Sequence, residues 1–311
     1  MKLSIVSTMY RSSPFLEEFC ARTLRAAQAL TPDFELILVN DGSPDDSLAL
    51  ALKLQSAAPH IQVVDLSRNF GHHAAIVAGL EQSRGERVFL IDCDLEEQPE
   101  WLSVFAEKLD TSGADVAFGV QQERVAAYTS NLFGETFWKA LNFMSSVPIP
   151  HNPMTCRLMT RRFVDAVVRV EDRVLYLAGV FAWTGFRQEP VLLKKIARAT
   201  TSKSTYNLPR KIIQVVDSFS SFSVMPLSLI FFLGLLIWLG SMTFALYLLV
   251  QKLLTPTLIL SGFTTITLSI WFLGGITILV LGVLGLYLAK VFQEVKRRPL
   301  YLVRDVYRGE K

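Results

Sequence analysis

Two aspartates stand two residues apart, directly after an apolar run. Val88–Ile91 is typical of a buried strand, and Asp92 and Asp94 follow it. In an extended chain, residues two apart point to the same side, so these carboxylates repel each other unless a cation lies between them. Mg²⁺ and Mn²⁺ are hard ions that prefer carboxylate, water and phosphate oxygens. We therefore predict that Asp92 and Asp94 hold such an ion beside a phosphate-bearing ligand.

An isolated pair of this kind is more often a solvated loop, so the interpretation depends on the elements around it. We predict strands at Leu3–Ser7, Phe34–Val39, Ile61–Leu66, Val88–Ile91 and Ala114–Val120. Helices are expected to begin near Ser13, Asp46, His72 and Pro99. This alternation predicts an α/β domain with a mostly parallel sheet and helices on both faces. Further along, Val174–Val191 predicts more helix and a closing strand around Trp183.

A polar cluster follows each of the first four strands, at Thr8–Ser12, Asn40–Asp46, Ser67–His73 and Asp92–Glu96. Ligands of such sheets bind outside the carboxyl ends of the strands, so the four clusters are expected to share one cleft. No Gly-x-Gly-x-x-Gly or P-loop pattern is present, which argues against nicotinamide, flavin and P-loop nucleotide folds. An aromatic ring, an acceptor turn and an acidic metal site suit a nucleotide base with a metal-bound diphosphate. We assign to nucleotide binding Thr8, Tyr10, Asn40, Asp41, Arg68 and Asp92.

The last third of the chain has a different composition. The 311 residues have a mean hydropathy of +0.35, and only Lys252 is charged between Asp217 and Lys290. Two uncharged segments, Leu227–Val250 and Ile266–Ala289, each span about 36 Å as helices, enough to cross a bilayer. Both outer flanks are basic, which places both chain ends on the cytoplasmic side. The catalytic domain is then also cytoplasmic.

We accordingly divide the chain into a catalytic domain (1–200), a juxtamembrane amphipathic segment (201–223), two membrane helices (224–292) and a basic tail (293–311). The juxtamembrane segment carries Lys203, Arg210 and Lys211 beside an apolar stripe, which is typical of a helix on a membrane surface. We predict that these three cations bind the phosphate of a lipid acceptor. Generic attraction to anionic lipids, or a solvated linker helix, is the alternative.

Charge, cysteines and glycines limit other interpretations. A net charge of +3 is too small to indicate a nucleic-acid partner. The three cysteines are scattered, without zinc-ligand spacing, which suggests a reducing compartment. Glycines 274, 275, 282 and 285 allow close helix approach, either within the hairpin or between protomers of a homo-oligomer. The aromatic segment Val125–Ser146 has helical spacing and suits either a core helix or a helix at the membrane edge.

Several short motifs occur together in one order: Met9-Tyr10, Val39–Ser43, Leu66–His72, Asp92–Glu96, Arg157-Leu158, Ser202–Tyr206, Gly285–Lys290 and Lys296–Tyr301. Their order resembles the inverting family 2 glycosyltransferases with a GT-A fold. Within them the chain looks like the polyprenyl-phosphate glycosyltransferases, the group of dolichol-phosphate mannose synthase and the bactoprenol glucosyltransferases. The resemblance implies a nucleotide-sugar donor and an undecaprenyl or dolichyl phosphate acceptor. It also implies catalytic roles for Asp94 and Arg157, and Glu96 as a third metal ligand.

The chain departs from this pattern at several positions. The usual Asn-Glu is Arg11-Ser12, and the usual Asp-Asp-Gly-Ser begins with Asn40. The family's Gly-Asp-Phe-Arg is Met154–Arg157, so a carboxylate often assigned a catalytic role is Thr155. Two alternatives therefore stay open. One is a membrane glycosyltransferase with another lipid or glycan acceptor, and the other is a scaffold of the same fold without turnover.

Overall fold

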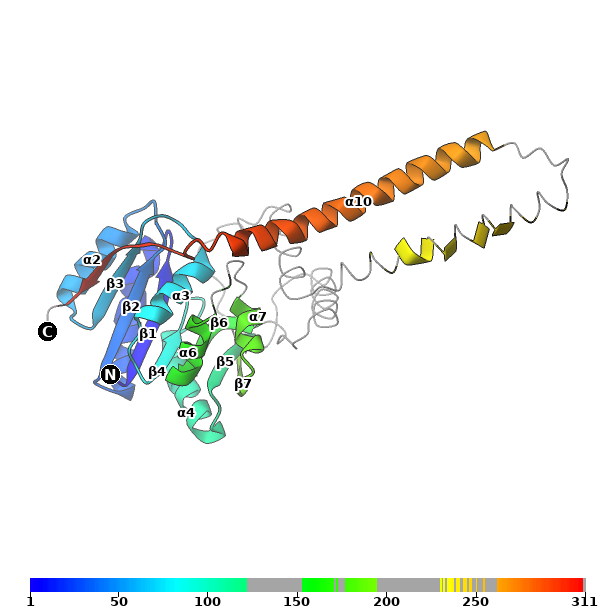
Figure 1. Ribbon diagram of the computed structural model, residues 1–311. Coiled ribbons are helices and arrows are strands. Elements are labelled where there is room, and N and C mark those ends of the chain that lie inside the picture. Colours follow the sequence, from blue (N-terminus) through cyan, green and yellow to red (C-terminus); the bar gives the residue numbers. More distant parts are fainter. Residues whose placement is uncertain are drawn as a thin grey trace. The chain divides into compact units, whose positions relative to one another are not determined.

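The computed structural model describes residues 1–121, 153–170, 172, 177–194 and 262–309, with scattered residues between 230 and 254. These residues form two compact units. The sheet unit contains the described residues up to Lys194 and again from Arg298 onward. The helical unit contains those from Ile230 to Arg297. We describe each unit by itself (Figure 1).

The sheet unit is built on eight strands in the order β7-β5-β6-β4-β1-β2-β3-β8. Their bounds are β1 Leu3–Met9, β2 Phe34–Asn40, β3 Ile61–Leu66, β4 Arg87–Leu90, β5 Val116–Gln121, β6 Pro153–Thr160, β7 Gln188–Leu193 and β8 Val303–Arg308. Neighbouring strands β4, β1, β2 and β3 are parallel, while β6 and β8 pair antiparallel with their neighbours. The four parallel strands therefore end at one edge of the sheet, which we call the carboxyl edge.

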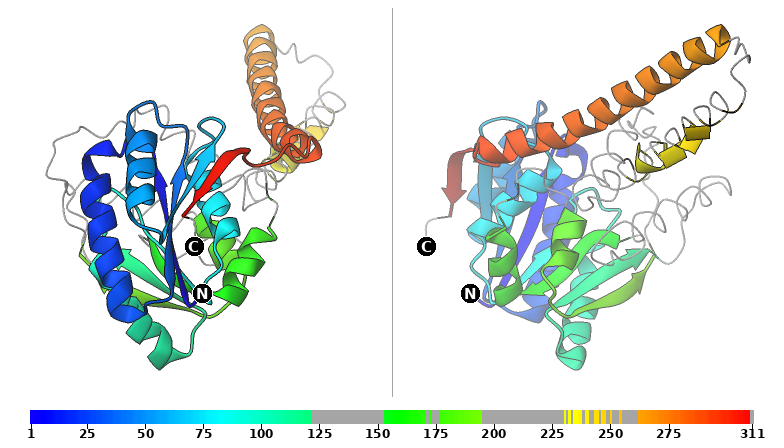
Figure 2. Two further views of the ribbon diagram at one scale, coloured as in Figure 1. Left: turned by 90° about the vertical axis from the view of Figure 1, so that its left-hand side faces the viewer. Right: turned by 45° about the vertical axis from the view of Figure 1, so that its right-hand side comes forward.

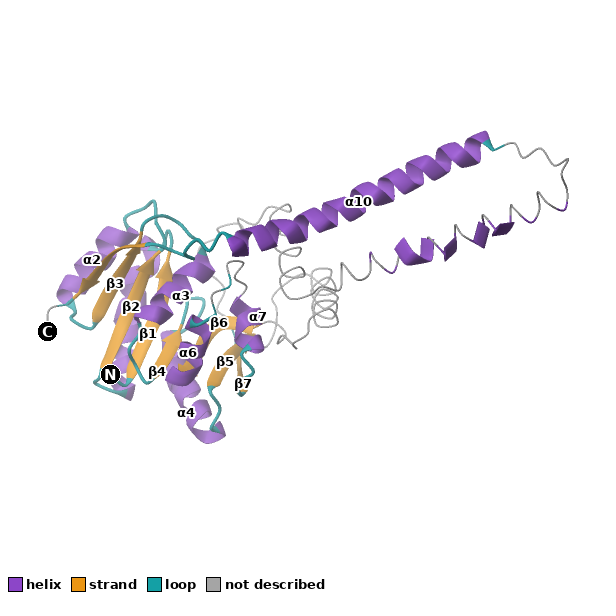
Figure 3. Cartoon of the chain, viewed as in Figure 1, coloured by secondary structure: helices purple, strands orange, loops and turns teal. Residues whose placement is uncertain are grey.

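Helices cover both faces of this sheet (Figures 2 and 3). They are α1 Ser13–Leu30, α2 Ser47–Ala57, α3 His72–Gln82, the 3-10 turn η1 Pro99–Trp101, α4 Leu102–Ser112, α6 Arg161–Val168 and α7 Leu177–Trp183. One face carries α3, which packs on β1, β2 and α6, while α1 packs against α2 and α4. All residues of β2 and β3 are buried, as expected of strands inside a sheet with helices on both faces, and this includes the polar residues Glu35, Asn40, Gln62 and Asp65. The prediction of a mostly parallel α/β sheet is confirmed.

The strands that end at the carboxyl edge are held by a close-packed core. Phe19, Phe89 and Phe105 are fully buried, and the rings of Phe89 and Phe105 are 5.6 Å apart. Replacing such a ring with alanine typically costs about 3–5 kcal/mol, through lost transfer energy and an unfilled cavity. The loops that leave the carboxyl edge therefore start from fixed strand ends.

Two expectations about the strands were wrong. Trp183 does not lie in a closing strand: it ends α7, and the strand β7 begins only at Gln188, after a turn in which Gly185 has φ +71°. The expected basic tail (293–311) contains β8, which pairs with the edge strand β3. Its charged side chains suit a sheet edge, where they face water, and this made the segment resemble a solvated tail.

In the helical unit, α10 (Phe263–Val295) contains the predicted span Ile266–Ala289. Its part Phe272–Val295 is long and apolar enough to cross a membrane, and none of its most apolar window is buried. It is the one such helix among the residues that the structure describes. Most of the other predicted span, Leu227–Val250, lies outside the described residues, although those described between 230 and 254 are helical. The two-helix hairpin therefore stays a prediction. The segments 125–146 and 201–223 also lie outside the described residues.

Candidate active site

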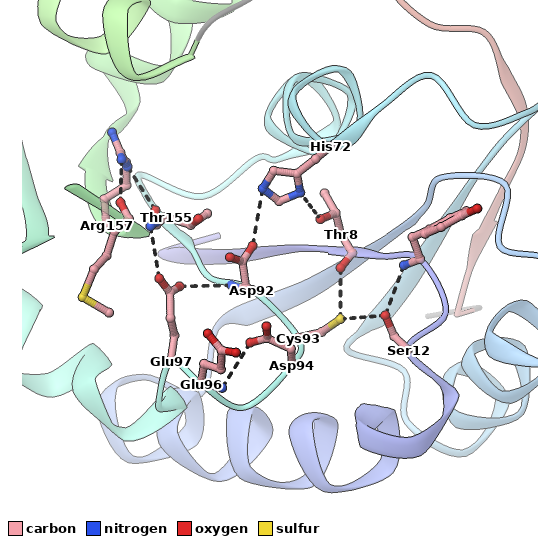
Figure 4. A network of polar contacts seen from close by, with 12 residues as sticks. Thr8, Ser12, His72, Asp92, Cys93, Asp94, Glu96, Glu97, Thr155 and Arg157 are labelled. Carbon is pink, nitrogen blue, oxygen red and sulfur yellow. Dashed lines mark hydrogen bonds and ion pairs between the residues drawn. The ribbon is translucent and has the colours of Figure 1, made fainter. Parts of the chain in front are cut away.

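Residues that follow or end β1, β3 and β4 meet at the carboxyl edge (Figure 4), and the loop after β2 joins them through Ser43. The hydroxyl oxygen of Thr8, near the end of β1, lies 3.0 Å from Nδ1 of His72, at the start of α3. On the other side of the same ring, Nε2 lies 3.6 Å from Oδ1 of Asp92, after β4. The backbone N–H of Arg11 donates to Oγ of Ser43 in the loop after β2. The expected convergence of Thr8 and Asp92 is thus observed, with His72, to which we assigned no role, between them.

Asp92 and Asp94 point away from the core, while the residue between them points into it. The Asp92 side chain is 24% exposed and Asp94 is half-buried. Cys93 is buried, and its thiol donates to the carbonyl of Thr8 at 3.0 Å and to Oγ of Ser12 at 3.2 Å. Burial raises the pKa of this thiol to about 12, so it stays neutral. The structure therefore shows a buried Cys93 between two partly exposed carboxylates, and their joint binding of a metal ion stays a prediction.

The turn after Asp94 has a backbone conformation that is uncommon outside glycine. Leu95 has φ +61°, and the N–H of Glu96 donates to Oδ1 of Asp94 at 3.1 Å. Nε2 of Gln98 donates to the Leu95 carbonyl at 2.7 Å, and the Leu95 side chain packs against the core. Left-handed backbone at a bulky residue costs free energy and is found at functional sites where the surroundings enforce it. Here two hydrogen bonds and a partly buried side chain hold the acidic turn.

The metal assignment can be tested against this geometry. In the described part of the chain, no group of three or more histidine, cysteine or acidic side chains is arranged to hold a metal ion. A complete protein cage with Glu96 as the third ligand is therefore not formed. Mg²⁺ usually takes one or two carboxylates and completes its shell with water and substrate phosphates. Asp92 and Asp94, both oxygen donors and both partly exposed, fit that kind of site.

Glu97 is a buried carboxylate to which our sequence interpretation gave no role. Its side chain is fully buried; one oxygen accepts the N–H of Asp92 at 3.3 Å and the other accepts that of Thr155 at 3.1 Å. It therefore ties the acidic turn to β6 (Figure 4). Nothing in the sequence indicated this role, because the left-handed residue Leu95 that precedes Glu97 in the turn is not a glycine and because the Thr155 partner lies 58 residues away.

Arg157 lies on β6 beside this link. Its Nε donates to the carbonyl of Thr155 at 3.1 Å and its terminal nitrogen to that of Met154 at 2.9 Å, while the guanidinium covers the ring of Phe181 at 4.0 Å. Burial lowers the pKa of Arg157 to about 10, and the charges of Glu97 and Asp92 act in the opposite direction. Arg157 is thus a buried cation at neutral pH, electrostatically coupled to the acidic turn.

Asn40 and Asp41, predicted to bind nucleotide, are both buried and engaged. The Asp41 side chain accepts the N–H of Phe70 at 2.7 Å and that of Gly71 at 3.0 Å. Burial raises the pKa of Asp41, and these two N–H groups oppose the rise. Asn40 donates to Asp65 at 2.7 Å. Both residues therefore shape the loops after β2 and β3, and their contact with a nucleotide stays a prediction.

The other predicted nucleotide-binding residues are exposed. The Tyr10 side chain is 46% exposed, next to Arg11, which has φ +57° and a guanidinium 5.6 Å from the Tyr10 ring centre. The guanidinium of Arg68 lies over the ring of Phe70 at 4.1 Å. Both aromatic–cation pairs are available to a ligand at this edge. The predicted acceptor residues Lys203, Arg210 and Lys211 lie outside the described residues.

Comparisons with known proteins show the family of the chain. Residues 4–168 match the family model described as Glycosyl transferase family 2. A protein of Mycobacterium tuberculosis named "Putative glycosyltransferases" is 42% identical over 307 residues, covering 99% of this chain and 89% of that protein. The bactoprenol glucosyl transferase of Shigella phage SfII is 29% identical over 311 residues, covering 99% of each.

Among solved structures, a mannosyltransferase from Pyrobaculum calidifontis in complex with GDP-Man and Mn²⁺ has a TM-score of 0.49 and 15% identity, and covers 71% of this chain and 63% of its own. The family model covers the parallel strands and all four loops of the carboxyl edge, the part of the chain that carries the acidic turn. With that match and a 42% identical relative over nearly its whole length, the chain belongs to the family 2 glycosyltransferases.

Proposed function

We propose that the protein transfers a sugar, with inversion, from a nucleotide sugar to a polyprenyl phosphate at the cytoplasmic face of a membrane. The undecaprenyl and dolichyl phosphates are the acceptors that this proposal covers. The observation that carries it is the acidic turn Asp92–Asp94 at the carboxyl edge, in a chain similar from end to end to a bactoprenol glucosyl transferase.

The nucleotide-sugar part of the proposal is supported by the contrast between buried and exposed residues in the loops. Asn40 and Asp41 hold the loops in place, whereas Tyr10 and Arg68 are exposed beside them. An exposed aromatic ring offers a stacking surface to a base, and a guanidinium matches phosphate geometry. A divalent ion between Asp92 and the donor diphosphate would supply the positive charge that a departing diphosphate needs.

The chemistry needs no general base at position 155. An oxygen of the acceptor phosphate forms a bond to the anomeric carbon. The bond from that carbon to the diphosphate oxygen breaks, and the nucleoside diphosphate leaves with the electron pair. A phosphate monoester is already an anion at neutral pH, because its second pKa lies near ~6, so no proton must be removed first. Thr155 in place of a carboxylate is therefore compatible with turnover, which then depends on positioning and charge.

The acceptor half is supported by the apolar third of the chain. α10 is long enough to span a bilayer and its most apolar window is not buried. A polyprenyl phosphate keeps its headgroup at the membrane surface, where the basic residues Lys203, Arg210 and Lys211 are expected. Membrane attachment and a lipid acceptor are thus one proposal, since an enzyme held at the interface meets this substrate by lateral diffusion.

The decisive experiment uses the full-length protein purified in detergent, MgCl₂ or MnCl₂, a panel of nucleotide sugars and undecaprenyl phosphate. We expect one donor to release its nucleoside diphosphate in proportion to a new glycolipid, whose anomeric configuration is opposite to that of the donor. Undecaprenol is the matched control, since it has the same chain without the phosphate. Equal transfer to undecaprenol would favour another lipid acceptor, and absence of any product across the panel would favour the scaffold alternative.

Topology is tested separately. A single accessible cysteine at position 261, between the two predicted spans, should be labelled from the far side of the membrane. One at position 311 should be labelled from the cytoplasmic side. Labelling of both from the same side would contradict the two-span topology without bearing on the chemistry.

A further inference from the structure

The strand β8 meets β3 at the point where the Ser67–Gly71 loop leaves the sheet. The two strands pair antiparallel from Gln62↔Arg308 to Leu66↔Val303, with an irregular register between Asp65 and Leu66. The N–H of Ser67 then donates to the carbonyl of Leu302 at 2.9 Å. The C-terminal segment thus reaches the carboxyl edge beside a loop that carries the predicted nucleotide-binding residue Arg68.

Arg304 of this strand holds two groups at that edge. One guanidinium nitrogen lies 3.2 Å from Oδ2 of Asp65, and another donates to the carbonyl of Ser67 at 2.7 Å. The Asp65 side chain is 2% exposed and that of Arg304 is 55% exposed. A carboxylate buried this deeply requires a charge partner or several hydrogen bonds. Arg304 supplies the charge partner that the described structure shows for Asp65.

The Asp65 carboxylate is also connected by hydrogen bonds to the loop after β2 and to the end of β1. Its other oxygen, Oδ1, accepts the side-chain amide of Asn40 at 2.7 Å, and the amide oxygen of Asn40 accepts the N–H of Ser43 at 3.1 Å. Oγ of Ser43 donates to the carbonyl of Met9 at 3.2 Å. The end of β1 and the loops after β2 and β3 are therefore joined by hydrogen bonds that start from Arg304.

Close backbone packing makes these loops dependent on one another. Gly42, in the loop after β2, has φ +60°, and a Cβ there would lie 2.5 Å from the backbone nitrogen of Asn69. Because the two loops touch with no side chain between them, a shift of one displaces the other. Asp41 adds its hydrogen bonds to Phe70 and Gly71 across the same junction.

We propose that Arg304 is a positioning residue for the nucleotide-binding loops. By pairing with Asp65 it orients the Asn40 amide, and by holding the Ser67 carbonyl it fixes the start of the β3 loop. Without it, Asp65 keeps only the Asn40 amide as its observed partner, and the loops after β2 and β3 lose their preorganised form. Donor binding must then order them, which weakens affinity. This inference rests on the proposed placement of the donor at these loops.

A strand that only closes the sheet edge would also stabilise the protein, and a second arginine of β8 separates the two roles. Arg308 pairs in register with Gln62, near the opposite end of β3, and donates to Gln82 at 3.2 Å. Arg308→Met removes a cation from the same strand without touching the Asp65–Asn40–Ser43 series. It is the matched control for Arg304→Met, and Arg304→Lys is the conservative variant that keeps the charge.

The first arm of the test needs no ligand. Hydrogen exchange of backbone amides in the full-length protein should be faster in Arg304→Met than in Arg308→Met at residues 40–43 and 67–71, by about tenfold, the factor that about 1.4 kcal/mol represents. Arg304→Lys should recover part of the protection. Equal exchange in the two methionine variants at these residues would overturn the proposal.

The second arm measures calorimetric affinity for UDP and for GDP with MnCl₂. For whichever nucleotide the wild type binds, we expect Arg304→Met to raise Kd about fivefold to twentyfold. The Kd of Arg308→Met should stay within about twofold of the wild-type value. In both variants the KM for undecaprenyl phosphate should not change. In an Asn40→Ala background, Arg304→Met should raise Kd by a smaller factor than in the wild type, because the branch through Asn40 is already lost and only the contacts of Arg304 with Asp65 and the Ser67 carbonyl remain to be removed. Unchanged Kd in Arg304→Met would contradict the inference, whereas a wild type that binds neither nucleotide would contradict the proposed donor and leave the exchange arm to decide.

Discussion

Two acidic turns lie at the same edge of the sheet and use their carboxylates differently. After β2, Asp41 is 3% exposed and accepts two backbone N–H groups. After β4, Asp92 is 24% exposed and Asp94 is half-buried, in a turn held by Leu95 in a left-handed conformation. The buried carboxylate holds the neighbouring loop, and the partly exposed pair is the one to which we assign the metal ion and the donor diphosphate. The same residue type thus has two roles, which burial and hydrogen-bond partners distinguish.

The largest expected effect tests the exposed pair. Asp94→Asn keeps the shape of the side chain but removes its charge, so turnover should fall by about 10²-fold or more through lost stabilisation of the leaving diphosphate. Thermal stability should change little, because Asp94 is not buried. Asp110→Asn is the control, since Asp110 pairs with Arg87 at the start of β4. Near-normal turnover of Asp94→Asn at saturating donor would contradict the metal assignment.

Variants of Arg157 test whether the connection between the acidic turn and β6 affects turnover. Arg157→Met removes a buried cation coupled to Asp92, so turnover should fall about tenfold to a hundredfold, and Arg157→Lys should recover part of it because it keeps the charge. Arg161→Met is the control for stability. Arg161 also donates to a backbone carbonyl, that of Gly85, but away from the metal turn. Equal turnover per folded molecule in Arg157→Met and Arg161→Met would make Arg157 a structural residue.

Asp41 tests the buried side of the comparison. Asp41→Ala leaves two loop N–H groups without their acceptor, so the free energy of unfolding should fall by about 1–3 kcal/mol. Donor affinity should fall with it, since the Phe70–Gly71 loop is no longer held. Chemical denaturation measures the first effect and calorimetry the second. A variant as stable as the wild type would show that Asp41 does not build the loop.

Tyr10 should give the smallest effect and should act on ligand alone. Tyr10→Ala removes an exposed ring, so stability should not change, while nucleotide Kd should rise about tenfold if a base stacks there. Tyr10→Phe keeps the ring and should bind as the wild type does. An unchanged Kd in Tyr10→Ala would place the base elsewhere.

The parallel strands and their shared edge could be predicted because each is an apolar run ending in polar residues. The antiparallel strands could not. β8 reads Val-Arg-Asp-Val-Tyr-Arg, and its partner β3 lies more than 230 residues earlier in the chain. Nothing local in such a charged segment distinguishes an edge strand from a solvated tail. Its assignment as a basic tail followed from composition alone.

The candidate site was predicted in the same partial way. Spacing indicated that Asp92 and Asp94 share one side, and the structure shows Cys93 buried between two partly exposed carboxylates. Spacing could not show that Asp41 is already bonded to Phe70, or that Glu97 is buried against Thr155, because those partners come from other strands. Residue type therefore indicated which edge of the sheet gathers the polar side chains, and only the tertiary contacts distinguished the partly exposed side chains from the buried, bonded ones.

The central claim is that Asp92 and Asp94 hold a divalent ion together with the donor diphosphate. Electron paramagnetic resonance can measure Mn²⁺ binding to the full-length protein with and without a nucleoside diphosphate from a panel that includes UDP and GDP. Because the described residues form no three-ligand group, we predict weak binding of Mn²⁺ alone and binding at least about tenfold tighter with the correct nucleotide. Asp94→Asn should abolish the difference. Equally tight Mn²⁺ binding without any nucleotide, or full coupling retained in Asp94→Asn, would contradict the account.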